Sequence, residues 1–367
     1  MLKPKALIFF QYLPPWRIDV FNEMAKFYDL TIAFTDADLD GFKYNREELL
    51  NKLDRNIKTI FLSKGFRVGK RPIRTGVFKI IKVLKPKVIF SHEYSATSIM
   101  VAKFKKKYKY QLVITTSDNL SIAKSVSGLK SYFRNYVLHR SNSVVVYSNR
   151  VKKWYEENFP YLNVEVCPNI QNPQSLLKYR CEFPELIKMY KEQFNLFNKK
   201  LILYSGRLEH IKGLDLLLSS FSKSRNSDCI LVLVGEGSKK DDLVTQTISL
   251  GIKDKVIFPG FYSGVKLYAW YEMAQFYVLP SRFEPFGAVI NEALIFGTPV
   301  MASKYIGAID FVTDQNGKLF DPLSEMEFVN VLDYFIENSG NFRNDNNSNL
   351  MPVSFQDYVE VFKKFAK

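Results

Sequence analysis

Two carboxylates stand eight residues apart in a segment where an apolar strand gives way to a helix. Glu284 falls in the loop, and Glu292 falls inside the helix, which we expect to begin near Phe286 or Gly287 and to end at Gly297. A carboxylate accepts hydrogen bonds from vicinal hydroxyls, so this pair could hold a hexose and a ribose at opposite ends of one nucleotide sugar. The alternative is structural, with Glu284 beside a helix dipole and Glu292 on a solvated face.

The start of the same helix offers backbone donors. The amides of Gly287 and Ala288 would point out of the first turn, where the helix dipole is positive, and could bind sugar hydroxyls or phosphate oxygens. Gly287 has no side chain, so a ligand could approach the backbone closely.

Two cations occupy an earlier loop of the same kind. Arg207 and Lys212 follow an apolar run and precede a helical segment. They suit a diphosphate, which Arg binds with a two-pronged guanidinium and Lys binds as a point charge. An ordinary basic loop is the alternative. A third loop, with Gly235 and Gly237, would also admit a ligand to the backbone, but the full GxGxxG pattern of a dinucleotide site is absent.

The elements that must position these loops are short apolar runs alternating with segments of helical periodicity, as in a parallel sheet covered by helices. A proline-containing segment, 168–198, interrupts this rhythm, which then restarts. We therefore expect an α/β fold of two doubly wound domains, with ligands beyond the carboxyl ends of the strands. The expected strands are 6–10, 30–34, 58–62, 87–91, 111–115, 143–147, 163–167, 201–205, 229–234, 255–258, 276–279 and 299–302, and the expected helices include 18–27, 73–84 and 151–158.

The composition limits the class of protein. A chain of 367 residues that is 47% hydrophobic is long enough for two domains and excludes a disordered or collagen-like protein. Its three cysteines have no metal-binding spacing, which argues against a zinc site or a disulfide scaffold and favours a reducing cytoplasm. It contains no apolar run of about 18 residues that could span a membrane.

The positive charge is concentrated in one half of the chain. The formal net charge is +15, yet residues 1–180 hold 32 Lys and Arg against 14 Asp and Glu, while the remainder hold 20 against 23. A surface of this kind attracts nucleic acid, anionic lipid or a phosphorylated substrate. A merely soluble basic face is the alternative.

Taken in order, the loops of the second half resemble those of the retaining glycosyltransferases of family 4. That family has the GT-B fold, in which two Rossmann-like doubly wound domains face a central cleft. The resemblance covers roughly residues 201–322. The motifs that carry it are Gly206-Arg207, Lys212-Gly213, Gly235-Glu236-Gly237, Phe258-Pro259-Gly260, Pro280-Ser281, Glu284-Pro285-Phe286-Gly287, Glu292-Ala293-Leu294, Gly297-Thr298-Pro299-Val300, Asn316-Gly317 and Phe320-Asp321-Pro322.

The resemblance implies roles for these residues. Arg207 and Lys212 would neutralise the donor diphosphate, Glu284 would hold the donor sugar, and Glu292 would bind the ribose. The remaining donor-binding positions would be Gly206, Gly235, Gly260, Phe261, Phe286, Gly287 and Ala288, with the nucleobase near Gly260 and Phe261. It also implies an acceptor-binding domain over 1–170, a linker over 171–198, a nucleotide-sugar domain over 199–350 and a helix within 351–367 that crosses back to the first domain.

The first half resembles the family more loosely. Family members often have a glycine-rich loop after their first strand, whereas this chain has a proline-containing loop in which Arg17 could contact phosphate by charge. His92 follows the strand 87–91, near the place where the family has a histidine beside the donor sugar. It could orient that sugar or relay the acceptor proton. A loop arginine and a structural histidine are the alternatives.

No metal or other cofactor is expected, because Arg207, Lys212 and a helix N-terminus can already balance the diphosphate. The rival indication is the DxD spacing of Asp36, Asp38 and Asp40, which in a different glycosyltransferase fold holds a divalent metal. These acids follow the second strand, far in sequence from the donor loops, so a solvated acidic turn is the favoured interpretation.

We therefore predict a retaining glycosyltransferase that moves a sugar from a nucleotide-diphosphate sugar to a glycan or polyprenyl-diphosphate-linked acceptor in cell-surface polysaccharide biosynthesis. The basic half would attach the otherwise cytoplasmic protein to the anionic inner face of the cell membrane. The alternatives are a GT-B nucleotide-sugar epimerase and a non-catalytic glycosyltransferase-like interaction protein. Nucleic-acid binding would account for the charge but for none of the donor loops.

Overall fold

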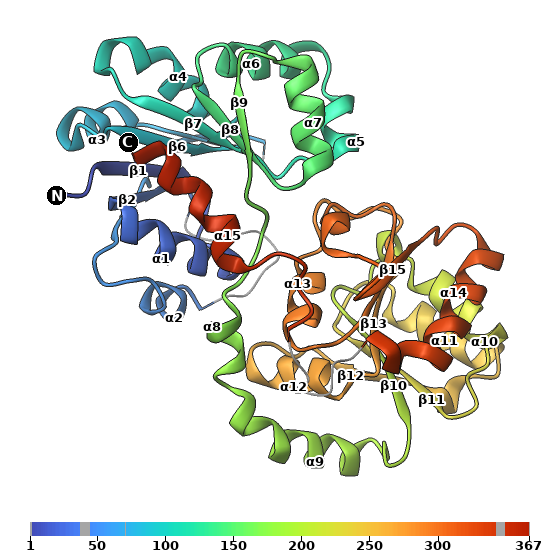
Figure 1. The fold of residues 1–367 in the computed structure, drawn as a ribbon. Helices are drawn as coiled ribbons and strands as arrows, with labels where there is room; N and C mark the ends of the chain where they lie inside the picture. Colours follow the sequence, from blue (N-terminus) through green and yellow to red (C-terminus); the bar gives the residue numbers. More distant parts are fainter. Residues whose placement is uncertain (1, 37–44, 70, 343–348, 367) are drawn as a thin grey trace. The chain divides into compact units, whose positions relative to one another are not determined.

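The computed structural model describes residues 2–36, 45–69, 71–342 and 349–366, which divide into two compact units (Figure 1). The first unit comprises Met1–Gln171 together with Ser354–Lys367, and the second comprises Asn172–Val353. Each unit is built on its own parallel sheet and is described by itself.

The sheet of the first unit has the strand order β3-β2-β1-β6-β7-β8-β9, and every neighbouring pair is parallel. Its central strands are runs of Val, Ile, Leu and Phe with almost no exposed side chain, as expected for a sheet covered on both faces. The order reverses between β1 and β6, which makes the carboxyl ends of these two strands the switch point where ligands bind in open α/β sheets. The strands are β1 (Lys5–Phe10), β2 (Asp29–Phe34), β3 (Lys58–Phe61), β6 (Val88–His92), β7 (Gln111–Thr115), β8 (Ser143–Val146) and β9 (Asn163–Val166).

Helices connect these strands and cover the sheet (Figure 1). Serine and asparagine side chains cap several of their N-termini, such as Ser95 before α4 and Asn119 before α5. The helices are α1 (Ile18–Phe27), α2 (Arg46–Asn51), α3 (Val77–Leu84), α4 (Ala96–Tyr108), α5 (Leu120–Ser125), α6 (Gly128–Leu138) and α7 (Asn149–Asn158).

A small antiparallel hairpin precedes α3 and corrects one expectation. Strands β4 (Gly65–Val68) and β5 (Arg71–Arg74) pair with each other, so the helix expected over 73–84 begins only at Val77. Gly76 adopts a positive φ of 93° at the junction, a conformation that separates the hairpin from the helix.

The C-terminal segment belongs to the first unit. The helix expected there is a short α15 (Phe355–Val359) followed by a 3-10 segment, Glu360–Ala366, and both pack on α1. The Tyr28 hydroxyl donates to the carbonyl of Phe362 at 2.6 Å, and Phe362 and Phe365 make edge contacts with Phe90 of β6.

The second unit repeats the architecture with the strand order β12-β11-β10-β13-β14-β15, again parallel throughout. Its switch point lies between β10 and β13. The strands are β10 (Lys200–Ser205), β11 (Cys229–Val234), β12 (Val256–Gly260), β13 (Phe276–Leu279), β14 (Val300–Ser303) and β15 (Gly317–Phe320). The helices are α8 (Pro173–Leu177), α9 (Phe183–Gln193), α10 (Leu214–Lys223), α11 (Lys240–Ser249), α12 (Val265–Met273), α13 (Ala288–Ile295) and α14 (Glu325–Asn338).

The segment 171–198 was expected as a linker, but most of it is folded. It contains α8 and α9, and the ring of Tyr190 in α9 stacks on Trp270 of α12 with 4.5 Å between ring centroids. These aromatic contacts bury apolar surface, and the prolines in this segment stand near helix starts, where a missing amide donor costs nothing.

Candidate functional site: the donor loops of the second unit

Glycine contacts bring together the loops that follow β10, β11 and β12. The amide of Gly206 donates to the carbonyl of Val234 at 3.0 Å, and the amide of Gly235 donates to the carbonyl of Gly260 at 2.9 Å. A Cβ atom on Gly235 would lie 1.9 Å from the carbonyl oxygen of Gly206, so only glycine fits there. Three of the predicted donor-binding positions thus share one backbone surface at the carboxyl edge of the sheet.

Lys212 and Glu284 form an ion pair across the switch point. Lys212 comes from the loop after β10 and Glu284 from the loop after β13, 72 positions apart, and Lys212 Nζ donates to Glu284 Oε2. Their side chains are only 13% and 16% exposed. Opposite charges in this setting attract more strongly than on an open surface, because little water screens them.

A second ion pair holds the same two loops in register. Both terminal nitrogens of the Arg282 guanidinium donate to the Asp215 carboxylate at 2.6 Å, and the amide of Arg282 donates to the carbonyl of Ile211 at 2.9 Å. Gly213 has a φ of +67°, and a Cβ atom there would lie 2.2 Å from the carbonyl oxygen of Pro280. The sequence did not single out Arg282 or Asp215, although Arg282 stands two positions before Glu284 and Asp215 three positions after Lys212.

The N-terminus of α13 presents free backbone donors. Gly287, at a φ of +95°, precedes the helix, and neither its amide nor that of Ala288 donates a hydrogen bond to any residue in the described ranges. The chain before the helix is fixed because the amide of Ala308 donates to the carbonyl of Phe286 at 2.7 Å. Gly307 makes this approach possible, since a Cβ atom there would lie 2.1 Å from the carbonyl oxygen of Pro285.

Glu292 is held by a hydroxyl chain that sequence reasoning missed. The Tyr271 hydroxyl donates to Glu292 Oε2 at 3.0 Å and lies 2.7 Å from Ser205 Oγ at the end of β10. Tyr271 is fully buried, which together with the charge of Glu292 raises the pKa of its phenol and keeps it protonated as a donor. Tyr271 sits in an apolar stretch of α12, where its sequence context indicates only core packing.

Two further predicted positions lie open on this edge. Arg207 is exposed, and its carbonyl accepts a hydrogen bond from the Tyr204 hydroxyl at 2.9 Å. Phe261 follows β12 and is 70% exposed, an unusual setting for so large an apolar ring.

Polar residues at the carboxyl edge of the first unit

His92 and Arg17 lie in the first unit, at its own switch point. The His92 ring stacks on Phe10, the last residue of β1, with 3.9 Å between centroids, and its Nδ1 is 3.0 Å from Thr115 Oγ1. Burial lowers the pKa of His92 to about 3, and the nearby positive charge of Arg17 adds to this shift. His92 is therefore a neutral imidazole at physiological pH.

Arg17 is 2% exposed and donates from a terminal nitrogen to the carbonyl of Pro168 at 3.1 Å. Its guanidinium also lies over the Tyr147 ring, 5.6 Å from the centroid. The expected phosphate contact would require the guanidinium to leave this enclosed position.

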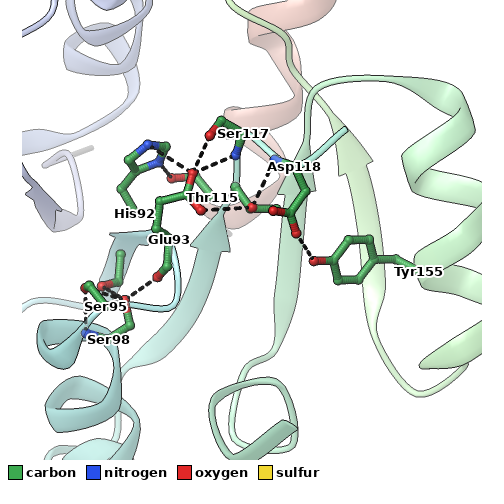
Figure 2. A network of polar contacts seen from close by, with 10 residues as sticks. His92, Glu93, Ser95, Ser98, Thr115, Ser117, Asp118 and Tyr155 are labelled. Atoms are coloured by element: carbon green, nitrogen blue, oxygen red, sulfur yellow. Dashed lines mark hydrogen bonds and ion pairs between the residues drawn. The ribbon is translucent and has the colours of Figure 1, made fainter. Parts of the chain in front are cut away.

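A hydrogen-bond network extends from His92 along the ends of β6 and β7 (Figure 2). Glu93 Oε1 accepts hydrogen bonds from the amide and hydroxyl of Ser117 at 2.8 and 2.6 Å, and Oε2 accepts one from Thr116 at 3.2 Å. Asp118 is 7% exposed and accepts from the Tyr155 hydroxyl at 2.8 Å. Burial and the neighbouring charge of Glu93 raise the pKa of Asp118 to about 6. Neither Glu93 nor Asp118 was predicted, although Glu93 directly follows β6 and Asp118 comes three residues after β7.

Of the three aspartates in the DxD alternative, the structure describes Asp36. Asp38 and Asp40 lie outside the described residues. Asp36 is buried, and its carboxylate accepts hydrogen bonds from Arg67 at 2.9 Å and Arg74 at 2.6 Å, both on the β4–β5 hairpin. Its charge is thus compensated within the first unit.

Comparisons with known proteins bear on the class of protein and on the fold. Residues 188–349 match the sequence model of the family described as glycosyl transferases group 1. An uncharacterized glycosyltransferase of Methanocaldococcus jannaschii is 37% identical over 116 residues, which are 31% of this chain and 30% of that protein. Mannosylfructose-phosphate synthase of Agrobacterium fabrum is 28% identical over 235 residues, 60% of this chain and 46% of that enzyme. The alignments therefore span less than half the length of these two relatives.

The fold comparison covers nearly the whole chain. The crystal structure of HepE from Anabaena in complex with UDP and glucose has a TM-score of 0.73 and 19% identity, over 98% of this chain and 97% of that one. This chain therefore has the GT-B fold, and its second unit carries a sequence that matches glycosyl transferases group 1.

Proposed function

We propose that this chain is a retaining glycosyltransferase of family 4 that moves a sugar from a nucleotide-diphosphate sugar to a glycan or lipid-linked glycan. The family match in the second unit and the relatives named above support a transferase. The observation that carries the donor assignment is the Lys212–Glu284 pair at the switch point of the second unit, beside a helix start with free amides. This arrangement can bind a diphosphate and a sugar hydroxyl side by side.

In this proposal the donor changes the partners of the ion pair. The diphosphate takes the Lys212 ammonium and the exposed Arg207, while Glu284 turns to accept hydrogen bonds from the donor sugar, together with the backbone of Phe286, Gly287 and Ala288. Glu292, already held by Tyr271, accepts the ribose hydroxyls. Gly206, Gly235 and Gly260 admit the ligand to the backbone, and the exposed Phe261 ring lies at the nucleobase.

The chemical step follows from where charge develops. The bond between the anomeric carbon and the diphosphate oxygen breaks, and negative charge accumulates on the leaving diphosphate, where Lys212, Arg207 and the α13 amides stabilise it. The acceptor oxygen attacks from the same face, and its proton passes to the leaving phosphate oxygen, so the anomeric configuration is retained. No metal ion takes part.

We assign acceptor binding to the first unit. His92 is neutral and stacked on the Phe10 ring, so it can orient a sugar by hydrogen bonding but cannot supply a positive charge. Burial, aided by the nearby positive charge of Arg17, keeps His92 neutral. Arg17 is kept as a phosphate contact in the proposal, which requires its guanidinium to leave the position over the Tyr147 ring.

The same unit has a surface that suits an anionic membrane. Lys103, Lys106 and Lys107 are exposed on α4, which packs against β5 of the hairpin. On that hairpin Phe66 and Val68 are 61% and 60% exposed. Basic residues and exposed apolar residues on neighbouring elements are typical of proteins that attach to the surface of an anionic bilayer. No helix in the part of the chain that the structure describes is long and apolar enough to cross a membrane. We propose that this surface docks on the inner face of the cell membrane, where a polyprenyl-diphosphate-linked glycan of cell-surface polysaccharide synthesis is presented.

Thermal shift with UDP-, GDP- and ADP-sugars tests the donor assignment, because a ligand that binds the folded state stabilises it by mass action. We expect one nucleotide series to raise the midpoint of unfolding and the Glu284→Gln and Lys212→Met variants to lose most of that shift. A Glu165→Gln variant, with its change in the other unit, serves as the control and should keep the shift. Absence of any shift in the wild type would contradict the proposal.

A further inference from the structure

Glu93 stands at the ligand edge of the first unit. The order of strands in that sheet reverses between β1 and β6, and Glu93 directly follows β6. The stacking of His92 on Phe10 shows that the ends of β1 and β6 are in contact at this point. In open α/β sheets the crevice beyond such a switch point is where ligands bind.

The backbone of Glu93 adopts a conformation that glutamate rarely takes. Its φ is +58°, in the left-handed region. The other non-glycine residues with positive φ in the described ranges are two helix C-caps, Lys85 and Lys109, and two asparagines after α9, Asn195 and Asn198, which are common settings for this conformation. Strain of this kind persists where surrounding contacts enforce it and clusters at functional sites.

Several contacts enforce the strained turn. The amide of Glu93 donates to the carbonyl of Thr115 at 2.8 Å, and its own carbonyl accepts from Ser98 Oγ at 2.5 Å. Ser98 is in turn anchored by the hydroxyls of Ser91 and Ser95, at 2.8 and 3.1 Å (Figure 2). The side chain is therefore presented in one direction by a prearranged backbone.

The carboxylate keeps one acceptor position open. Oε1 already accepts two hydrogen bonds from Ser117 and lies 3.4 Å from His92 Nε2, whereas Oε2 accepts only the hydrogen bond from Thr116 among the described residues. A carboxylate oxygen can accept two hydrogen bonds. The Glu93 side chain is 36% exposed, so this free position of Oε2 is open to a ligand.

We propose that Glu93 binds the acceptor sugar by accepting a hydrogen bond from one of its hydroxyl groups at Oε2. The proposal rests on the proposed transferase function for the identity of the ligand as a sugar. The ligand is bound without covalent chemistry, and His92, whose Nε2 lies 3.4 Å from Glu93 Oε1, stands beside the same carboxylate.

Two substitutions remove this acceptor while keeping the fold. In Glu93→Gln, the amide oxygen can keep the Ser117 hydrogen bonds while the NH2 group replaces Oε2, so the position becomes a donor. In Glu93→Gly the carboxylate is removed, and glycine adopts a φ of +58° without strain. The matched control is Asp118→Asn, which changes a carboxylate of the same network that is 7% exposed and closed to a ligand.

Saturation-transfer NMR on the full chain measures binding of the methyl glycosides of glucose, galactose, mannose and N-acetylglucosamine. We expect at least one glycoside to bind the wild type and Asp118→Asn, and both Glu93 variants to bind it about tenfold more weakly or less, as for the loss of a hydrogen bond to a charged group. Equal affinity in the Glu93 variants, or no glycoside binding to the wild type, would overturn the proposal.

Thermal shift of the same proteins with nucleotide sugars separates a failure of the Glu93 proposal from a failure of the transferase proposal. If a nucleotide sugar stabilises every protein but the Glu93 variants bind glycosides normally, only the role of Glu93 is wrong. If no nucleotide sugar stabilises any of them, the transferase function is wrong.

Discussion

The Lys212–Glu284 pair allows stability and activity to be separated by one set of variants. Lys212→Met removes the ammonium and keeps a side chain of similar length, which leaves the Glu284 carboxylate without its partner. Breaking a fully buried pair costs about 3–5 kcal/mol. Because these side chains are 13% and 16% exposed, we expect a somewhat smaller cost, about 2–3 kcal/mol. For a unit of this size that corresponds to a midpoint lowered by about 5–10 °C.

Lys212→Met should also lower the rate of sugar transfer, independently of its effect on stability. Removing one group that stabilises developing charge typically lowers kcat by about 10²–10³. In the double variant Lys212→Met/Glu284→Gln no charge is left unpaired, so stability should return close to that of the wild type. Activity should not return, because both the diphosphate contact and the sugar contact are gone.

Calorimetry gives the midpoint of each member of this cycle, and release of nucleoside diphosphate gives its rate. Recovery of stability without recovery of rate is the expected pattern. If Lys212→Met unfolds at the wild-type temperature and turns over at the wild-type rate, the ion pair has neither the energetic nor the catalytic importance assigned to it.

Three further outcomes are expected. The pKa of Asp118 is about 6 in the folded state and 3.8 in the unfolded state, so the protonated carboxyl favours folding. This contribution to stability, at most about 3 kcal/mol, is lost as the pH rises through 6. Asp118→Asn should therefore gain stability relative to the wild type between pH 5 and pH 7.5, and a constant difference in unfolding midpoint would refute the shift. In Gly235→Ala the new Cβ would lie 1.9 Å from a carbonyl oxygen, whereas in Gly251→Ala nothing lies within 4 Å and only the φ of +67° opposes alanine. The unfolding midpoint should therefore fall further in Gly235→Ala. Equal losses would show that the loop contact relaxes. Lys106→Glu/Lys107→Glu should weaken binding to phosphatidylglycerol vesicles at least about tenfold and leave donor-induced stabilisation intact, whereas equal binding of the wild type to neutral and anionic vesicles would contradict membrane docking.

Much of the fold could be predicted because its strands are buried on both faces. Runs such as Leu201 to Tyr204 are continuously apolar, and that pattern is a local property of the sequence. Strand β15, with the sequence GKLF, is short and contains a lysine, so its apolar signal is too weak to stand out. The β4–β5 hairpin is mostly exposed and lacks a buried face, which removes the alternation that marks a strand.

The candidate site residues could be named from the sequence, but their contacts could not. Glu284 and Lys212 were expected to act on one donor, yet their ion pair joins positions 72 apart, which no local pattern encodes. Tyr271 was missed because an aromatic residue in an apolar helix indicates core packing until its hydroxyl is placed beside Glu292. Glu93 could have been noticed as a carboxylate directly after a buried strand, the position at which His92 was already singled out.

Acceptor-dependent transfer tests the central claim most directly. The full chain is incubated with the nucleotide sugar that stabilises it, with and without a lipid-linked glycan acceptor, and release of nucleoside diphosphate is followed together with the anomeric configuration of the product. The account predicts release that requires the acceptor, a product with the donor's configuration, and loss of both in Glu284→Gln. Release that is independent of any acceptor, conversion of the donor to an epimer, or full activity of Glu284→Gln would contradict it.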